Sequence, residues 1–284
     1  MAQYKLFAFA DEAGASLDEQ IAAMKRNGLD GLEIRFVDGK NVAAFTLEEA
    51  KEVKKKMDDA GLVTWSIGSP LGKLEIDSQD FPIHLDTFKH TLELAHILGA
   101  DHLRMFSFYT PKGQSPADYK EAVMEKLGAF VRAAEGSGIL LCHENEKGIY
   151  GDVASRCLEI AKAFPSMRLV FDPANFVQCG QETLSAWQML KPYTHYMHIK
   201  DALSDGSIVP AGEGIGNVAA IAKDYLAMKG DASAFTVEPH LKVFGGLGEL
   251  ERQGEDSAVE KAFVFRTNGE AFDAACSYFR KTLL

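Results

Sequence analysis

Four side chains able to bind a divalent metal ion lie in the second half of the sequence, each directly after an apolar or aromatic run. They are Glu144 in "LLCHENE", Asp172 in "RLVFDPAN", His198 in "HYMHIKDA" and Glu238 in "AFTVEPH". Three carboxylates that meet in a dry site repel one another and raise the pKa of at least one of them. One divalent ion bound by the three carboxylates and the imidazole would remove this repulsion. The ligand set suits Mn²⁺, Mg²⁺, Co²⁺ or Zn²⁺.

Each of these positions also has an ordinary structural explanation when it is taken alone. Glu144 would suit a solvated strand end, and Asp172 stands before Pro173, where it would suit the start of a turn. His198 would fit a hydrogen-bonded structural histidine. Four such residues on four successive strands are harder to explain separately, so we favour the shared metal site.

The elements that must position these side chains are strands, and the chain offers eight runs of strand length. Most runs are nearly continuous apolar segments, which is typical of parallel strands covered on both faces. They are residues 5–11, 31–36, 63–70, 102–109, 138–146, 168–175, 195–202 and 234–240.

Helix-like segments alternate with these runs. Residues 16–28 open on Ser16 as an N-cap, and residues 46–61 open on Thr46 with Glu49 three residues later, which is a capping box. Further helical segments are expected at 82–100, 115–138, 155–164 and 270–284. Eight alternating units predict an α/β fold, a single (β/α)₈ TIM barrel that spans residues 1–284.

A doubly wound open sheet is the main alternative fold. Such a sheet usually carries a glycine-rich phosphate loop after its first strand, and "FADEAGAS" does not match GxGxxG. In a barrel, by contrast, the carboxyl ends of all the strands meet at one mouth, where the active site lies.

Composition limits the function classes. The chain is 46% hydrophobic and 25% charged, which is ordinary for a soluble globular protein. No apolar run approaches the roughly 20 residues that span a bilayer, and we interpret the N-terminus as a first strand, not a signal peptide. Four widely spaced cysteines without a CxxC pair predict reduced thiols and a cytoplasmic location. A net charge of −11 argues against a nucleic-acid partner.

The motifs resemble those of the xylose isomerase-like TIM-barrel superfamily of sugar isomerases and epimerases. The resemblance covers essentially the whole chain and rests on "HENE", "FDPANF", "HIKDA" and "VEPH", together with the glycine-containing loop "VPAGEGIGN" at 209–217. It implies that Glu144, Asp172, His198 and Glu238 hold one metal ion. It also implies that Glu144 and Glu238 are catalytic and exchange protons with the substrate. The family often has Glu-Asn-His after strand five, whereas here Glu146 takes the third place and adds negative charge.

The resemblance implies a metal-dependent isomerase or epimerase of a sugar or sugar phosphate. The ion, with manganese among the candidates, would polarise a carbonyl and stabilise an enediolate, and a carboxylate on each side of the substrate would move the proton. Return of the proton to the same carbon from the opposite face gives epimerisation, and return to the neighbouring carbon gives isomerisation. Which glutamate acts as base stays open.

Five further polar residues are candidate substrate contacts: Arg104, Glu146, Lys200, Glu213 and His240. Glu213 lies in a loop that could cover the site. Alternatively, each cationic side chain pairs with a nearby carboxylate, as Arg35 would with Glu33. Phe9 and Trp65 either line the sugar pocket or belong to the barrel core.

Two further residues are given a role or excluded from the site by their positions in the sequence. The second ring nitrogen of His198 needs an acceptor, and Asp201 is the candidate. Strand alternation turns His143 away from Glu144, so it is placed outside the site.

Three other functions remain open. An inosose-type dehydratase would begin with the same proton abstraction and then expel a hydroxyl. A non-catalytic sugar-binding barrel would retain the fold and bind without turnover. A metal-dependent nuclease, another activity of this superfamily, would need further histidines that the early strand ends lack. The expected partner is a small sugar or polyol, and homo-oligomerisation is expected only by analogy.

Overall fold

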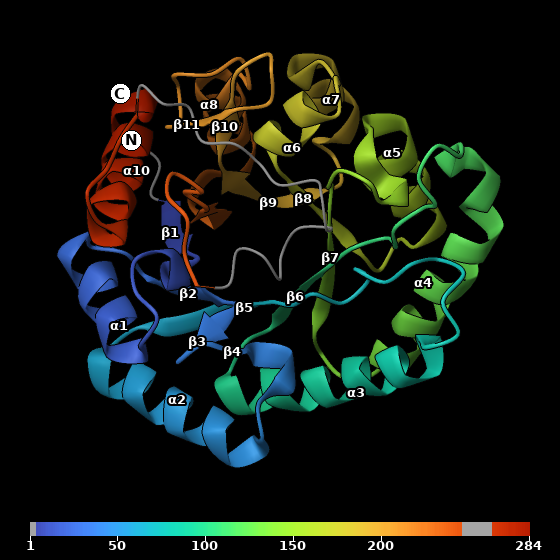
Figure 1. Ribbon diagram of the computed structural model, residues 1–284, viewed down its shortest axis with the longest axis horizontal. Helices are drawn as coiled ribbons and strands as arrows, with labels where there is room; N and C mark the ends of the chain where they lie inside the picture. The colour runs from blue at the N-terminus through green and yellow to red at the C-terminus, as the bar shows by residue number, and fades with distance from the viewer. Residues whose placement is uncertain (1–3, 246–262) are drawn as a thin grey trace.

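Eight parallel strands close into a barrel in the computed structural model, which describes residues 4–245 and 263–284 (Figure 1). Around the barrel the strands follow the order β1-β12-β9-β8-β7-β6-β5-β2. The predicted (β/α)₈ barrel is therefore confirmed, and each of the eight predicted runs overlaps a barrel strand. The strands are β1 Tyr4–Ala8, β2 Gly31–Ile34, β5 Val63–Gly68, β6 His102–Met105, β7 Leu140–Glu144, β8 Arg168–Phe171, β9 Thr194–Ile199 and β12 Ser233–Val237.

Helices form a ring around the barrel, and α10 lies beside α1 and α8, so that the last helix packs next to the first (Figure 1). Two helices begin as predicted, because Ser16 with Glu19 and Thr46 with Glu49 each form a complete capping box. Within the described residues, no helix combines the length and apolar character needed to cross a bilayer. The helices are α1 Leu17–Arg26, α2 Leu47–Ala60, α3 Phe81–Leu98, α4 Lys120–Ala134, α5 Ala154–Ala163, α6 Pro173–Gln178, α7 Thr183–Leu190, α8 Val218–Lys229 and α10 Asn268–Leu283.

Several of the observed elements are not predicted from the sequence. Helix α6 has 6 residues and α7 has 8, which is too short for a clear apolar period. Two short ribbons also lie outside the barrel, β3 Phe36–Val37 with β4 Lys40–Asn41 and β10 Asp201–Ala202 with β11 Ile208–Val209. The first ribbon turns at Asp38 and Gly39, both of which have positive φ.

Alternation along each strand sends every second side chain into the barrel. Near the start of the strands these side chains are mostly apolar, and Phe7, Cys142, Val170, Tyr196 and Ala234 pack together. Two residues further along, four of these five strands carry polar side chains, which are Glu144, Asp172, His198 and Thr236, whereas on β1 the apolar Phe9 follows Phe7. The strands thus place an apolar floor beneath a polar mouth.

The loop that follows β9 is folded around the carboxylate of Asp201. This carboxylate accepts backbone N–H bonds from Ala202 (2.9 Å), Gly212 (2.9 Å), Gly214 (3.2 Å) and Gly216 (2.9 Å). A Cβ atom at Gly214 would lie 2.3 Å from Asp201 Oδ1, and one at Gly216 would lie 2.6 Å from it. Gly214 and Gly216 of "VPAGEGIGN" are therefore needed for close approach to Asp201.

Replacing Asp201 with Ala should destabilise the fold by about 1–3 kcal/mol, because it leaves buried backbone N–H groups without acceptors. Urea denaturation measures the change. The control is Asp205→Ala in the same connection, where an exposed carboxylate accepts from Ser207 N at 2.9 Å; its cost should stay within about 0.5 kcal/mol. Equal losses in the two variants would contradict the role given to Asp201.

Candidate metal centre

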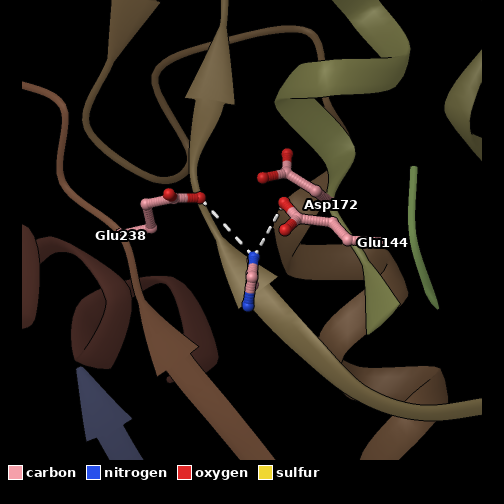
Figure 2. Close-up of side chains that lie close together, drawn as sticks. Glu144, Asp172 and Glu238 are labelled. Carbon is pink, nitrogen blue, oxygen red and sulfur yellow. Dashed lines mark hydrogen bonds and ion pairs between the residues drawn. The ribbon is translucent and has the colours of Figure 1, made fainter. Parts of the chain in front are cut away.

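Glu144, Asp172, His198 and Glu238 come together at the mouth of the barrel, as their places at successive strand ends predict. Each contributes one nitrogen or oxygen atom to a group in which all the atoms lie within 4.8 Å of one another, and all four residues are buried. Figure 2 shows the carboxylates of Glu144, Asp172 and Glu238 converging from separate elements. Neighbouring parallel strands have therefore produced one compact group of ligand atoms.

Asp172 uses its two oxygens differently. Oδ1 caps α6 by accepting a bond from the backbone N–H of Asn175 at 2.9 Å. Oδ2 is buried and accepts no hydrogen bond. Burial raises the pKa of Asp172 to about 7, and the nearby carboxylates add to the rise, whereas Lys200 opposes it. Asp172 can therefore both cap α6 and bind a metal ion, because it uses Oδ1 for the cap and has Oδ2 for the ion.

His198 has a carboxylate at each ring nitrogen. Nδ1 lies 3.0 Å from Glu144 Oε1 and 3.5 Å from Glu238 Oε2, so this nitrogen faces the ligand group. Nε2 lies 3.1 Å from Glu33 Oε2, while the Tyr196 hydroxyl donates to Glu33 Oε1 at 2.7 Å. A carboxylate behind the imidazole is the usual way of orienting a metal-binding histidine.

The prediction that Asp201 holds His198 is therefore wrong, and Glu33 takes that place. The sequence places Glu33 near the end of a strand in the same barrel, but strand position alone does not show that it reaches across the barrel to His198. Burial acts to lower the pKa of His198, but the charges of Glu144 and Glu33 outweigh it and hold the pKa well above its ordinary value.

Glu238 is fixed by Arg35, which was expected to pair with Glu33. Arg35 Nη1 donates to Glu238 Oε1 at 3.0 Å, and the other donors reach Asp11 (2.9 and 3.2 Å) and Glu12 (3.0 Å). The expected pairing with Glu33 is wrong because the guanidinium extends past it toward the loop after β1. This arrangement leaves Glu238 Oε2 directed toward Lys200 and His198.

Lys200 lies between two candidate ligands. Its Nζ is 3.0 Å from Asp172 Oδ2 and 3.0 Å from Glu238 Oε2, and the side chain is buried. A single positive charge therefore already stabilises this point. A divalent ion held by the same oxygens would repel the ammonium, which would then turn toward the pocket.

The residues present fit a divalent ion. The donors are carboxylate oxygens and one imidazole nitrogen, a set suited to hard or borderline ions. Asp172 Oδ2 is buried and accepts no hydrogen bond, although it forms an ion pair with Lys200. A second group, formed by Glu12, Glu238 and His240, also has ligand-like spacing. There the guanidinium of Arg35 already binds Glu12 and Glu238, so this second group already has its cation.

A pocket with about 360 Å³ of empty volume, part of it open to solvent, adjoins the ligand group, and Glu144 and Glu238 are among its lining residues. Four of the five predicted contacts line it, namely Arg104, Glu146, Lys200 and His240. Glu213 is exposed on its loop and is not among the lining residues. The pocket is also lined by residues not proposed as contacts, which include Lys73, Phe106, Lys147, Asn175 and Gln178.

Glu146, which stands where the family often has a histidine, forms an ion pair with Lys73. Lys73 Nζ donates to Glu146 Oε2 at 3.2 Å and lies 4.4 Å from the centre of the Phe106 ring. Burial acts to raise the pKa of Glu146, but Lys73 and other nearby lysines outweigh it and lower the pKa. The extra negative charge is thus balanced within the pocket wall.

The aromatic side chains divide between the floor and the site. Trp65 stacks on Phe7 with ring centres 4.7 Å apart, and it does not line the pocket. The ring of Phe9 lies edge-on to His198 at 5.1 Å. His143 points away from the ligands toward the turn at Gly151, where a Cβ atom would lie 2.8 Å from His143 Nε2. Its predicted place outside the site is confirmed.

Comparison with known proteins identifies the family. The family model described as xylose isomerase-like TIM barrel matches residues 21–253. The chain belongs to this family. A search of curated protein sequences finds no match.

Solved structures share the fold at low sequence identity. The IOLI protein with a binding zinc atom has a TM-score of 0.73 at 16% identity, covering 98% of this chain and 98% of that one. The probable 3-DHS dehydratase AsbF from Bacillus anthracis has a TM-score of 0.69 at 15% identity, covering 98% and 97%. The 3-keto-D-glucoside 4-epimerase YcjR from E. coli has a TM-score of 0.69 at 13% identity, covering 99% and 100%.

Replacing Glu33 with Gln should weaken binding of Mn²⁺ about 10–100-fold, because the imidazole of His198 loses the carboxylate that orients it. Isothermal titration calorimetry measures the affinity. The control is Glu146→Gln, which removes a pocket carboxylate outside the ligand group and should leave the affinity nearly unchanged. If both variants bound Mn²⁺ as the unaltered protein does, Glu33 would have no part in the centre.

Binding of Mn²⁺ should also weaken as the pH falls from 8 to 6. Asp172, whose pKa is raised to about 7, is largely ionised at the higher pH and largely protonated at the lower one. The ion binds only the ionised carboxylate. Titrations in buffers with different heats of ionisation should show more protons released at pH 6 than at pH 8. Equal affinity at both pH values would contradict either the raised pKa of Asp172 or its role as a ligand.

Proposed function

We propose that this barrel is a divalent-metal-dependent isomerase or epimerase that moves a proton beside the carbonyl of a sugar or polyol. The observation that carries the proposal is the convergence of three buried carboxylates and one imidazole, with Asp172 Oδ2 left without a hydrogen bond. Glu144, Asp172, His198 and Glu238 would hold the ion. When bound, it would polarise the carbonyl and stabilise the negative charge that proton removal leaves.

Two of the proposed ligands, Glu144 and Glu238, would also move the proton. Glu144 and Glu238 face each other across the site (Figure 2). Asn175 Nδ2 donates to Glu144 at 3.2 Å and Arg35 to Glu238 at 3.0 Å, so each carboxylate is held from behind. A substrate carbon between them could lose its proton to one and regain a proton from the other. Return to the same carbon from the opposite face epimerises it, and return to the neighbouring carbon isomerises the sugar.

Dehydration is the second candidate reaction. Its support is Lys200, an ammonium within 3.0 Å of two candidate ligands, because an acid at this point could protonate a departing hydroxyl. The names of structurally similar proteins include both an epimerase and a probable dehydratase. Product mass separates the two reactions, since dehydration removes one water from the substrate.

The direct test is deuterium exchange. The Mn²⁺-loaded protein is incubated in D₂O with a panel of ketoses, aldoses, inososes and their acid derivatives, and the products are analysed by NMR and mass spectrometry. One substrate carbon beside the carbonyl should gain deuterium without loss of water. Exchange accompanied by loss of water would instead support the dehydratase, and binding without exchange would support a non-catalytic barrel.

The glutamates can be separated from the other ligands by substitution. At saturating Mn²⁺, Glu144→Gln and Glu238→Gln should each lower the turnover rate about 10²–10⁴-fold, because an amide cannot accept the proton. His198→Gln should recover part of its activity as Mn²⁺ is added, since its defect lies in metal affinity. Recovery of both glutamate variants with excess Mn²⁺ would mean that they act only as ligands.

A further inference from the structure

The guanidinium of Arg104 is a buried cation that forms no hydrogen bond with the described residues, although it lies in ion-pair range of two carboxylates. The residue lies on β6, is 3% exposed and lines the pocket. Its closest carboxylate oxygens are Glu144 Oε2 at 3.4 Å and Glu33 Oε1 at 3.8 Å from Nε, and Nε forms no hydrogen bond with either. An arginine cannot discharge itself by losing a proton. The cost of burying it calls for an acceptor.

Arg35, at the same mouth of the barrel, is a buried arginine whose guanidinium is hydrogen-bonded to protein carboxylates. It is 2% exposed, and its donors form four hydrogen bonds to Asp11, Glu12 and Glu238. The two guanidinium groups are therefore equally buried but differently used. Arg35 organises the protein, whereas the donors of Arg104 remain available to a ligand in the pocket.

The guanidinium of Arg104 is mounted on aromatic rings. Its central carbon lies 4.6 Å from the centre of the Phe106 ring and 5.3 Å from that of Phe9. A Cβ atom at Gly68 would lie 3.2 Å from Arg104 Nη2, so the glycine leaves room for the group. A guanidinium held in this way suits the planar, two-point hydrogen bonding that a carboxylate provides.

The positive charge of the pocket lining also favours an anionic ligand. Lys73, Lys147 and Lys200 line the pocket with Arg104. Of the carboxylates that line it, Glu144 and Glu238 would be neutralised by the bound ion. Lys200 would then lose its attraction to Glu238. The metal-loaded pocket would therefore attract an anionic group.

Building on the proposed function, we propose that the substrate is a sugar acid and that Arg104 binds its carboxylate. The carboxylate accepts two parallel hydrogen bonds from the guanidinium, which places the neighbouring carbons above Glu144 and Glu238. A phosphate ester would bring a bulkier and more highly charged group beside Glu33 and Glu144, so a carboxylate fits this deep position better.

Three non-reacting six-carbon probes test the proposal, because they differ in the group at one end of the chain. They are D-gluconate with a carboxylate, D-glucitol with a hydroxyl, and D-glucitol 6-phosphate. Calorimetric titrations are run on the full chain with and without Mn²⁺, and none of the probes has an aldehyde or ketone group to turn over. Gluconate should bind at least about tenfold more tightly than glucitol, which corresponds to about 1.4 kcal/mol.

Two variants separate the arginine from general positive charge. Arg104→Met should abolish the preference for gluconate, while Lys147→Met, which removes one charge from the same pocket, should retain most of it. If Arg104→Met does not fold, Arg104→Lys replaces it and should lose most of the preference, because a lysine retains the charge without the paired donors.

Four outcomes would overturn the proposal: equal binding of gluconate and glucitol, tighter binding of the phosphate, a preference that survives loss of the guanidinium, or equal losses at positions 104 and 147. Binding of these probes requires no turnover. Deuterium exchange in neutral sugars without a preference for gluconate would refute only the sugar-acid proposal. A gluconate preference without exchange in any member of the substrate panel would refute only the proposed reaction.

Discussion

Mutual repulsion among buried carboxylates is the constraint on which the mouth of this barrel depends. Burial raises the pKa of Asp172 to about 7 and that of Glu12 to about 8, even though Lys200 and Arg35 act to lower them. Further loss of positive charge would favour the protonated forms of both groups. The chain supplies that charge at separate points. Arg35 binds the carboxylates after β1 together with Glu238, and Lys200 lies against Asp172 and Glu238. A divalent ion bound between the ligand atoms would supply the remaining positive charge.

Several residues meet this constraint while also building the fold. Asp172 caps a helix with one oxygen and presents the other to the ligand group. Glu33 binds both Tyr196 on the barrel interior and His198 at the mouth, and so connects the floor to the site. Asp201 holds the glycine loop that follows the strand carrying His198. Stability and chemistry therefore depend on many of the same side chains.

The sequence was informative about strand ends and less so about contacts across the barrel. Glu144 and Glu238 could be predicted to meet because parallel strands in a barrel share one mouth. The pairing of His198 with Glu33 could not, because it joins β9 to β2 and depends on how far each side chain reaches into the interior. The Asp-Gly pair at residues 38 and 39 is typical of two-residue hairpin turns, so the ribbon of β3 and β4 was predictable from the sequence. Glu213 was placed by its loop, and the structure leaves that residue exposed.

The central claim is that Glu144, Asp172, His198 and Glu238 bind one divalent ion. The most direct measurement is anomalous diffraction from crystals of the protein soaked in Mn²⁺. The account predicts one peak at bonding distance from Asp172 Oδ2, His198 Nδ1 and both glutamates, with the ammonium of Lys200 moved away from Asp172 and Glu238. A peak between Glu12, Glu238 and His240 instead, or no peak at saturating Mn²⁺ with Lys200 still between the two carboxylates, would contradict it.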